Sequence, residues 1–169
     1  MAETAAEYKQ RVLGYLGKQS PLAALAAAPR KLERAVAKAT PARRKRRPAP
    51  DKWSIAEIAA HLADTEVVIA YRLRLILGQP GAAIIGFDQD QWATGMDYAK
   101  RSLQQSVRQF QAVRAANVAL LRSLRPAQWK HHGVHNERGP ETIATIARLT
   151  AGHDLNHLQQ IDAILHGVR

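Results

Sequence analysis

The chain has 169 residues, of which 46% are hydrophobic and none is cysteine. This length suits one domain with its own hydrophobic core, so we expect residues 1–169 to form a single domain. The absence of cysteine excludes disulfides, thiolate metal sites and cysteine nucleophiles, so any metal must be held by histidine, carboxylate or water. The net charge of +11 at pH 7 raises the alternative of a protein that binds polyanions.

The start of the chain lacks the pattern of a secretory signal. Glu3, Glu7, Lys9 and Arg11 interrupt the apolar stretch that such a signal requires. No part of the chain approaches the ~18 consecutive apolar residues of a membrane span. We therefore expect a cytoplasmic protein that does not contact a membrane.

Two helical segments are expected at the beginning of the chain. The first runs from about Thr4 to Leu16, with its apolar residues at helical spacing. The second begins at Pro21 and continues to about Val36. Because proline lacks the N–H group of a helical hydrogen bond, we expect a kink or a break at Pro29.

A proline-rich segment, residues 40–52, contains the basic run Arg43–Arg47. The run has nothing apolar to bury, so we predict a flexible linker between the first and second helices of the fold. The alternative is a patch that binds nucleic acid. No aromatic residue or recognition motif accompanies the run, so a nucleic-acid partner is not expected.

The next helix, over residues 54–78, has a clear beginning. Ser54 and Glu57 have the spacing of an S-x-x-E capping box. Trp53, directly before them, can pack on Ile58 as a hydrophobic staple. The sequence therefore predicts a sharp helix start after Ser54.

Two further helices complete the expected fold. One runs from about Asp90 or Met96 to Leu124, and the last begins near Pro140 and ends at Gly167. The segments expected to be irregular are residues 79–89 and 126–140. Alanine is abundant and strand signals are weak, so we predict an all-α protein, a four-helix bundle joined by long loops.

His153 and His157 lie four residues apart on the apolar face of the last helix. That face contains Ile143, Ile146, Thr150, His153, His157, Ile161 and Ile164. A buried imidazole without a partner costs on the order of 1–3 kcal/mol, and one metal ion would satisfy both rings. The alternative is that each ring is a core residue with its own hydrogen-bond partner.

His61 lies on the helix over residues 54–78, about 60° around the helix axis from Ile58 and near the edge of the apolar face. A bundle could bring it opposite His153 and His157. Three imidazoles with an open fourth position are the ligands of many catalytic zinc sites, although nickel, iron and copper also bind neutral imidazole. The segment HDLNH lacks the glutamate of the HExxH proteases.

Other polar residues lie close to these histidines in the sequence. Asp64 and Asp154 could orient a ligand imidazole, and the alternative is that both are solvated helix carboxylates. His131, His132 and His135 precede the last helix and are expected to be surface residues of a loop. Alternatively, they could line the rim of a pocket or bind metal adventitiously.

Two segments of the chain are distinctive: they read RRPAPDKWSIAEIAAHLADTE and, about ninety residues later, AGHDLNHLQQI. Both resemble the characteristic segments of the DinB-like superfamily of metalloenzymes, also called DinB/YfiT-like. The intervening FDQDQWATGMDYAKRS and HNERGPETI resemble its bacillithiol-transferase-like branch. The resemblance covers nearly the whole chain and is weakest over residues 1–40.

The resemblance implies a four-helix bundle with an up-down-down-up connection that is often dimeric, so we expect a homodimer. It also implies a divalent metal held by His61, His153 and His157. Zinc and nickel are the leading candidates, with manganese and iron as alternatives. Known members of the family include S-transferases that use bacillithiol, mycothiol or a similar low-molecular-weight thiol.

We therefore expect a metal-dependent enzyme that acts on a small molecule, with thiol S-transfer as the leading reaction. A bound metal lowers the pKa of a thiol and so produces a nucleophile at neutral pH. The alternatives are a metal-dependent hydrolase and a non-catalytic metal-binding or regulatory helical module. Arg72, Arg74 and Arg148 are candidates for binding an anionic thiol cofactor.

Overall fold

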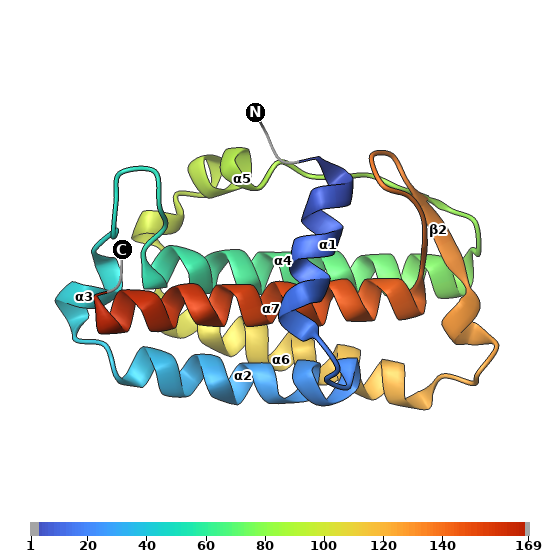
Figure 1. Cartoon of the computed structure of the whole chain (residues 1–169), viewed down its shortest axis with the longest axis horizontal. Helices are drawn as coiled ribbons and strands as arrows, with labels where there is room; N and C mark the ends of the chain where they lie inside the picture. Colours follow the sequence, from blue (N-terminus) through green and yellow to red (C-terminus); the bar gives the residue numbers. More distant parts are fainter. Residues whose placement is uncertain (1–3, 168–169) are drawn as a thin grey trace.

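The computed structural model describes residues 4–167, and four long helices form its body (Figure 1). These helices are α2 (Pro21–Ala37), α4 (Ile55–Gly78), α6 (Leu103–Ser123) and α7 (Ile143–His166). Helix α4 packs against α6 and α7, and α2 packs against the same two helices. The fold is therefore a four-helix bundle, as predicted. Within the described part of the chain, no helix has the length and apolar character needed to cross a bilayer.

The four helices follow the predicted up-down-down-up order. Strand β1 (Ala83–Ile84), which follows α4, pairs with strand β2 (His132–His135), which follows α6. The last residues of α4 and α6 therefore lie at the same end of the bundle, and the two helices run in the same direction (Figure 1). Between them the chain returns along the bundle through α5 (Gln89–Gly95) and the 3-10 turn η1 (Tyr98–Lys100). Helices α2 and α7 run in the opposite direction (Figure 1).

The predicted start of α4 is confirmed. The Glu57 N–H donates to Oγ of Ser54 at 3.3 Å, and the Ser54 N–H donates to Oε2 of Glu57 at 2.8 Å. Trp53 packs against the apolar cluster of the core that contains Ile58. These contacts fix the first residue of α4, so they also fix which α4 side chains point into the bundle.

A small sheet closes one end of the bundle, where the sequence predicts irregular segments. Strand β1 pairs in parallel with β2, and β2 pairs antiparallel with β3 (Gly139–Thr142), which follows it after a turn. The strands have two to four residues, too few for an alternating pattern to be recognised in the sequence. Gly133 permits close approach of β1, because a Cβ at this position would lie 2.7 Å from Cδ1 of Ile84.

Helix α2 continues through Pro29, so of the two predicted outcomes, a kink or a break, the break is wrong. A proline inside a helix leaves the carbonyl four residues earlier without its usual N–H donor. That carbonyl belongs to Leu25, and it accepts a hydrogen bond from Nη1 of Arg114 at 3.2 Å. A side chain of α6 therefore replaces the hydrogen bond that Pro29 cannot make.

The basic linker lies where the sequence places it, but it binds the bundle and is not a free connector. It contains a short helix, α3 (Pro41–Lys45). Nη1 of Arg43 donates to the carbonyl of Leu165 at 2.9 Å. Arg47 donates through Nε and Nη2 to the carboxylate of Glu57, which also caps α4. The expectation of a flexible segment overlooked these two distant partners.

The carboxylate of Glu57, which caps α4, should make the free energy of unfolding depend on pH. Burial raises the pKa of Glu57, but hydrogen bonds from Arg47 and Ser54 outweigh this effect and hold the pKa below its usual value of 4.5. A group with a lowered folded-state pKa stabilises the fold above its unfolded pKa, and the contribution disappears as the pH falls through the folded value. We expect urea unfolding to show wild type more stable than Glu57→Gln at pH 7, with the difference shrinking below about pH 4.5. A difference of equal size at pH 3 would contradict this role.

Helix α1 (Ala5–Leu16) lies outside the bundle and crosses α7 (Figure 1). The crossing point is Gly152, where an added Cβ would lie only 2.1 Å from the carbonyl oxygen of Val12. Val12 is completely buried at this contact. Glycine is therefore required at residue 152 for α1 to reach α7, directly beside His153.

Replacing Gly152 with Ala is expected to displace α1 and to lower the free energy of unfolding by about 1–3 kcal/mol, because the added methyl overpacks a backbone contact. Urea denaturation measures this change. Gly14→Ala on α1 is the matched control, because nothing lies within 4 Å of a Cβ there. Equal stability of the two variants would show that α1 can shift without cost.

Candidate metal centre

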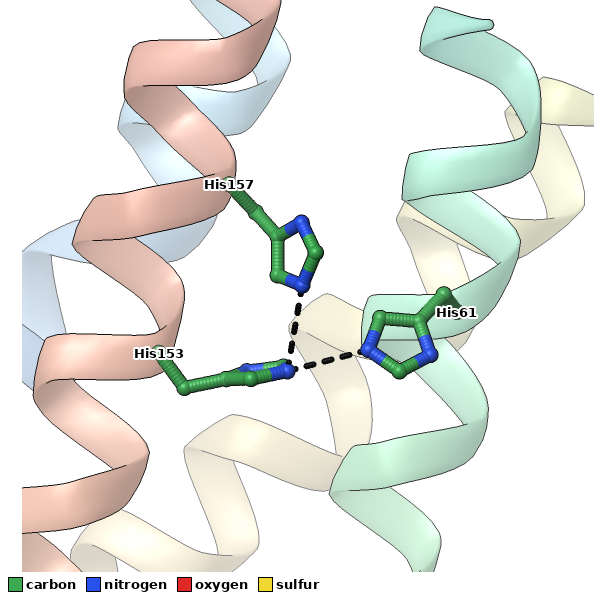
Figure 2. A group of neighbouring side chains, drawn as sticks. All are labelled: His61, His153 and His157. Atoms are coloured by element: carbon green, nitrogen blue, oxygen red, sulfur yellow. Dashed lines mark hydrogen bonds between the residues drawn. The ribbon is translucent and has the colours of Figure 1, made fainter. Parts of the chain in front are cut away.

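Three histidine side chains from two helices converge inside the bundle (Figure 2). His61 belongs to α4, and His153 and His157 belong to α7; their exposed fractions are 1%, 8% and 6%. Nε2 of His153 lies 2.9 Å from Nε2 of His61 and 3.1 Å from Nε2 of His157. The structure thus brings together the three residues that the sequence singles out.

The donor set fits a divalent metal. Two nitrogens bound at ~2.05 Å to a tetrahedral zinc ion are about 3.3 Å apart, which is close to the observed spacings. All ligand atoms of the cluster lie within 4.8 Å of one another. The atoms that meet are the Nε2 nitrogens of all three rings, so each ring offers one donor to the same point (Figure 2).

The protonation state of the cluster also suits a metal. Burial lowers the pKa of His61 well below 6.5, and the neighbouring His153 and His157 lower it further. Burial and His153 lower the pKa of His157 to about 3, against smaller opposing effects of Gln160 and Asp154. His61 and His157 are therefore neutral at pH 7, the state in which imidazole binds a cation.

Local structure determines where the rings lie. The capped start of α4 places His61 in the second turn, facing α7. The four-residue spacing of His153 and His157 places both on one face of α7. The ring of Trp53 lies 4.8 Å from the His61 ring and 6.3 Å from the His157 ring, measured between centroids. Trp53 therefore covers one side of the cluster in addition to packing at the start of α4.

Gln160 orients His157 and was not predicted as a site residue. Its Oε1 lies 2.8 Å from Nδ1 of His157. Because an amide oxygen only accepts hydrogen bonds, Nδ1 carries the ring proton and Nε2 presents its lone pair to the cluster. The signal was present in the sequence, since H-x-x-Q places the two side chains one helical turn apart.

The two aspartates that could orient a ligand imidazole have other partners. The carboxylate of Asp64 accepts a hydrogen bond from Nη1 of Arg101, and Asp154 accepts hydrogen bonds from Arg114. Nδ1 of His153 lies 4.0 Å from Oδ1 of Asp154, beyond hydrogen-bond distance. Neither aspartate is a solvated helix carboxylate either, because both are buried.

Arg114 joins the two helices that carry the histidines. Its buried guanidinium pairs with Asp154 on α7 and donates to Oε2 of Glu66 on α4 at 2.6 Å. Nδ2 of Asn117 donates to Oε1 of Glu66 at 2.7 Å. Sequence reasoning missed this network, although Arg114 and Asn117 fall on the same buried face of α6 as Phe110.

A cavity of about 460 Å³ extends from the histidines toward the sheet. Its long walls come from α4 and α7, and α1 and the β2–β3 hairpin supply other parts. Thr65 and Thr150 line it near His61 and His153. This volume is in the range of pockets that hold small molecules.

The three histidines before α7 differ in their surroundings. His132 is exposed and His131 is half-buried, but His135 is 1% exposed and lines the cavity. The prediction of a surface residue is therefore wrong for His135. The alternative, a role in lining a pocket, describes it better.

The three arginines that were candidates for binding an anionic cofactor differ in burial and in their position relative to the cavity. Arg72 is buried and lines the cavity. Arg74 is exposed and donates to Oδ1 of Asn117 at 3.0 Å, on the side of α6. Arg148 is exposed and does not line the cavity. Only Arg72 is in position to contact a ligand there.

The model of the DinB superfamily matches residues 24–161 of this chain, a segment that includes all three histidines. The chain belongs to the DinB superfamily. Helix α1, which closes part of the cavity of this DinB superfamily protein, lies outside the matched residues.

Two proteins of Oceanobacillus iheyensis are similar to this DinB superfamily chain. "Putative metal-dependent hydrolase OB0413" is 26% identical over 113 residues, which are 67% of this chain and 65% of that protein. "Putative metal-dependent hydrolase OB0782" is 27% identical over 112 residues, which are 66% of this chain and 64% of that protein. The match thus spans slightly less than two thirds of the length of each relative.

A solved structure shares the fold of this DinB superfamily chain. It is described as "YfiT from Bacillus subtilis is a probable metal-dependent hydrolase with an unusual four-helix bundle topology". The TM-score is 0.80, at 24% identity, and the alignment covers 85% of this chain and 83% of YfiT. The two proteins therefore have the same bundle architecture.

Proposed function

We propose that this chain is a divalent-metal-dependent enzyme that transfers a low-molecular-weight thiol to a small electrophilic substrate. The observation that carries the proposal is the convergence of three histidines at the wall of the cavity. Three histidine ligands leave a further coordination position for a small molecule. His61 and His153 line the cavity, so that position faces the space where a substrate fits. Zinc and nickel are the leading metals, with manganese and iron as alternatives.

A divalent cation held by His61, His153 and His157 would lower the pKa of a thiol and so supply a nucleophile at neutral pH. Gln160 keeps the lone pair of His157 directed at the cluster. The ring of Trp53 covers one side of the cluster. The electrophile would bind in the adjoining cavity.

The positions of the carboxylates favour a thiol over water as the nucleophile. Of the described residues, the carboxylates that line the cavity are Glu137 and Glu141, and both belong to the sheet end. Glu66 and Asp154, nearer the histidines, are engaged by Arg114. Metalloproteases of the HExxH type use a free glutamate as general base to deprotonate water. A thiol, with a pKa of about 8.5, loses its proton more readily than water and needs less help from a base.

Metal-dependent hydrolysis is the second candidate. The words "metal-dependent hydrolase" in the names of the two Oceanobacillus iheyensis relatives and in the description of YfiT support it. The same open coordination position could take water in place of a thiol. A third candidate is a metal-binding module without catalysis.

The test uses protein purified without a His-tag and reloaded with zinc, nickel or manganese. Thiol transfer is measured with glutathione or bacillithiol and a chlorodinitrobenzene electrophile, and hydrolysis with a nitrophenyl ester. We expect metal-dependent thiol transfer in wild type and in the exposed-residue control His132→Ala, and none in His157→Ala. Metal-dependent hydrolysis alone would select the second candidate, and stoichiometric metal without either activity would select the third.

We also propose that the chain forms a homodimer. The proposal is supported by the family resemblance and by the exposed apolar side chains Ile85 and Val134, which are 70% and 44% exposed. The exposed apolar surface at this place is small, because Ile84, which precedes Ile85, is buried. Light scattering over a concentration series should give the mass of a dimer; a constant monomer mass would refute it.

A further inference from the structure

We propose that the sheet end of the cavity binds a carboxylate of the substrate, through the Nε2–H group of His135 and the guanidinium of Arg72. The inference rests on the proposed function, because it names the substrate class of the same cavity. That class is an elongated thiol with a carboxylate remote from its sulfur. Both residues line the cavity, at the end away from the three clustered histidines.

His135 has a buried donor without a partner. Its Nδ1 accepts a hydrogen bond from the N–H of Glu137 at 3.1 Å, so the proton of the neutral ring is on Nε2. Burial and the positive charges of Arg138 and Arg72 lower the pKa of His135, which keeps the ring neutral at pH 7. Nε2 is buried and has no hydrogen-bond partner in the described part of the chain. Such unpaired buried donors are rare, and a ligand group would satisfy this one.

Arg72 is a buried cation without a carboxylate partner. It is 7% exposed, and its Nη2 donates to the backbone carbonyl of Ile85 at 2.8 Å. No carboxylate among residues 4–167 forms an ion pair with it, whereas the other buried arginine, Arg114, has two such partners. Glu141 and Glu137 act on Arg72 electrostatically, but neither forms an ion pair with it. A buried charge without a directly bound counter-charge is unfavourable, so the position of Arg72 indicates an anionic ligand.

The other buried charges at this end of the cavity are already paired. Arg138 donates to both carboxylate oxygens of Glu141, at 2.7 and 3.0 Å, and Nζ of Lys9 lies 3.6 Å from the same carboxylate. Glu137 is exposed to solvent. One unpaired cation and one neutral donor therefore match a singly charged carboxylate, and a doubly charged phosphate would leave an excess of negative charge beside two glutamates.

The two ends of the cavity also determine the length of the ligand. His61 and Arg72 are eleven residues apart on α4, which corresponds to about 16 Å along the helix axis. Cysteine is too short to contact both ends. A tripeptide is about 10 Å long when extended. The protein side chains at the two ends of the cavity extend toward the ligand and can cover the rest of this distance. The cavity of about 460 Å³ has room for such a molecule.

Isothermal titration with the tripeptide thiol glutathione and with its diethyl ester, which lacks both carboxylates, tests the inference. We expect wild type to bind the acid about tenfold more tightly than the ester, in zinc-loaded and in metal-free protein. His135→Asn keeps an oxygen that can accept from the Glu137 N–H but removes the Nε2 donor, so it should lose most of this preference. His135→Gln places an amide N–H near the Nε2 position and should retain it.

Two arginine variants separate a specific site from general attraction to a basic protein. Arg72→Gln and Arg74→Gln remove the same charge from the same helix, but Arg74 lies outside the cavity. We expect loss of the preference for the acid in Arg72→Gln and an unchanged preference in Arg74→Gln. Neutral substitutions of His135 leave the charge at pH 7 unchanged, so an effect there cannot arise from net charge.

The inference is overturned if wild type binds glutathione no more tightly than the ester, or if Arg72→Gln and Arg74→Gln weaken the preference equally. Because binding is also measured without metal, a failure of the proposed thiol transfer can be distinguished from a failure of the carboxylate site. A preference for the acid that depends on His135 and Arg72 in a protein without thiol-transfer activity supports the carboxylate site and counts only against the reaction.

Discussion

Replacing Arg114 with Met is expected to lower the free energy of unfolding by about 3–5 kcal/mol. The guanidinium is 2% exposed and pairs with the buried carboxylates of Glu66 and Asp154. Without it, two negative charges lie in the core with no counter-charge, and the Leu25 carbonyl opposite Pro29 loses its donor. Because Glu66 and Asp154 belong to the helices that carry the histidines, the spacing of the metal centre should also loosen.

Urea unfolding at pH 7 measures this effect. Arg108→Met is the matched control, because Arg108 is exposed on the same helix, and we expect it to change stability by less than about 0.5 kcal/mol. Adding Glu66→Leu and Asp154→Leu to Arg114→Met should recover much of the loss, since an apolar replacement of a whole buried ion network is often tolerated. The interpretation fails if Arg114→Met is within about 1 kcal/mol of the control.

Substituting Ala for His61, His153 or His157 is expected to weaken metal binding by more than about 100-fold, because even residues that only orient a ligand contribute 10–100-fold. Helical circular dichroism should persist in each variant. The two apolar clusters of the core consist of other residues, and a chain of this length can fold without the ion.

The measurement is metal content by mass spectrometry, on tag-free protein after dialysis against zinc or nickel. His132→Ala should bind as wild type does, because His132 is exposed and does not belong to the cluster. Gln160→Leu should bind about 10–100-fold more weakly, since it removes the partner of His157 Nδ1. Full occupancy in the double variant His153→Ala/His157→Ala would show that the metal binds elsewhere.

The sequence by itself determined the features that depend on neighbouring residues. The capping box at Ser54 and Glu57 fixed the start of α4, because both partners lie within one helical turn. The apolar face of the last helix indicated that His153 and His157 point inward together, since helical periodicity relates residues four apart. The order of long helical segments and loops indicated a bundle, and the position of His61 near the edge of the apolar face of its helix made it a candidate third ligand. The resemblance supplied the connection of the bundle and supported all three histidines as the ligand set.

The tertiary structure alone decided the features that join distant residues. Pro29 does not end α2 because Arg114, far along the chain, donates to the carbonyl that it leaves free. The linker is held by Glu57 and Leu165, and strands of two to four residues form only because β1 and β2 meet at the same end of the bundle.

The charges and donors of the cavity likewise depend on the fold. Local pattern gives no indication that Arg72 is buried without an ion-pair partner or that His135 lines the same cavity. Whether a polar group has a partner is a property of the space around it, and elements far apart in the sequence fill that space. Periodicity and caps therefore placed the three histidines on the inward faces of their helices, and only packing revealed which other polar groups line the cavity beside them.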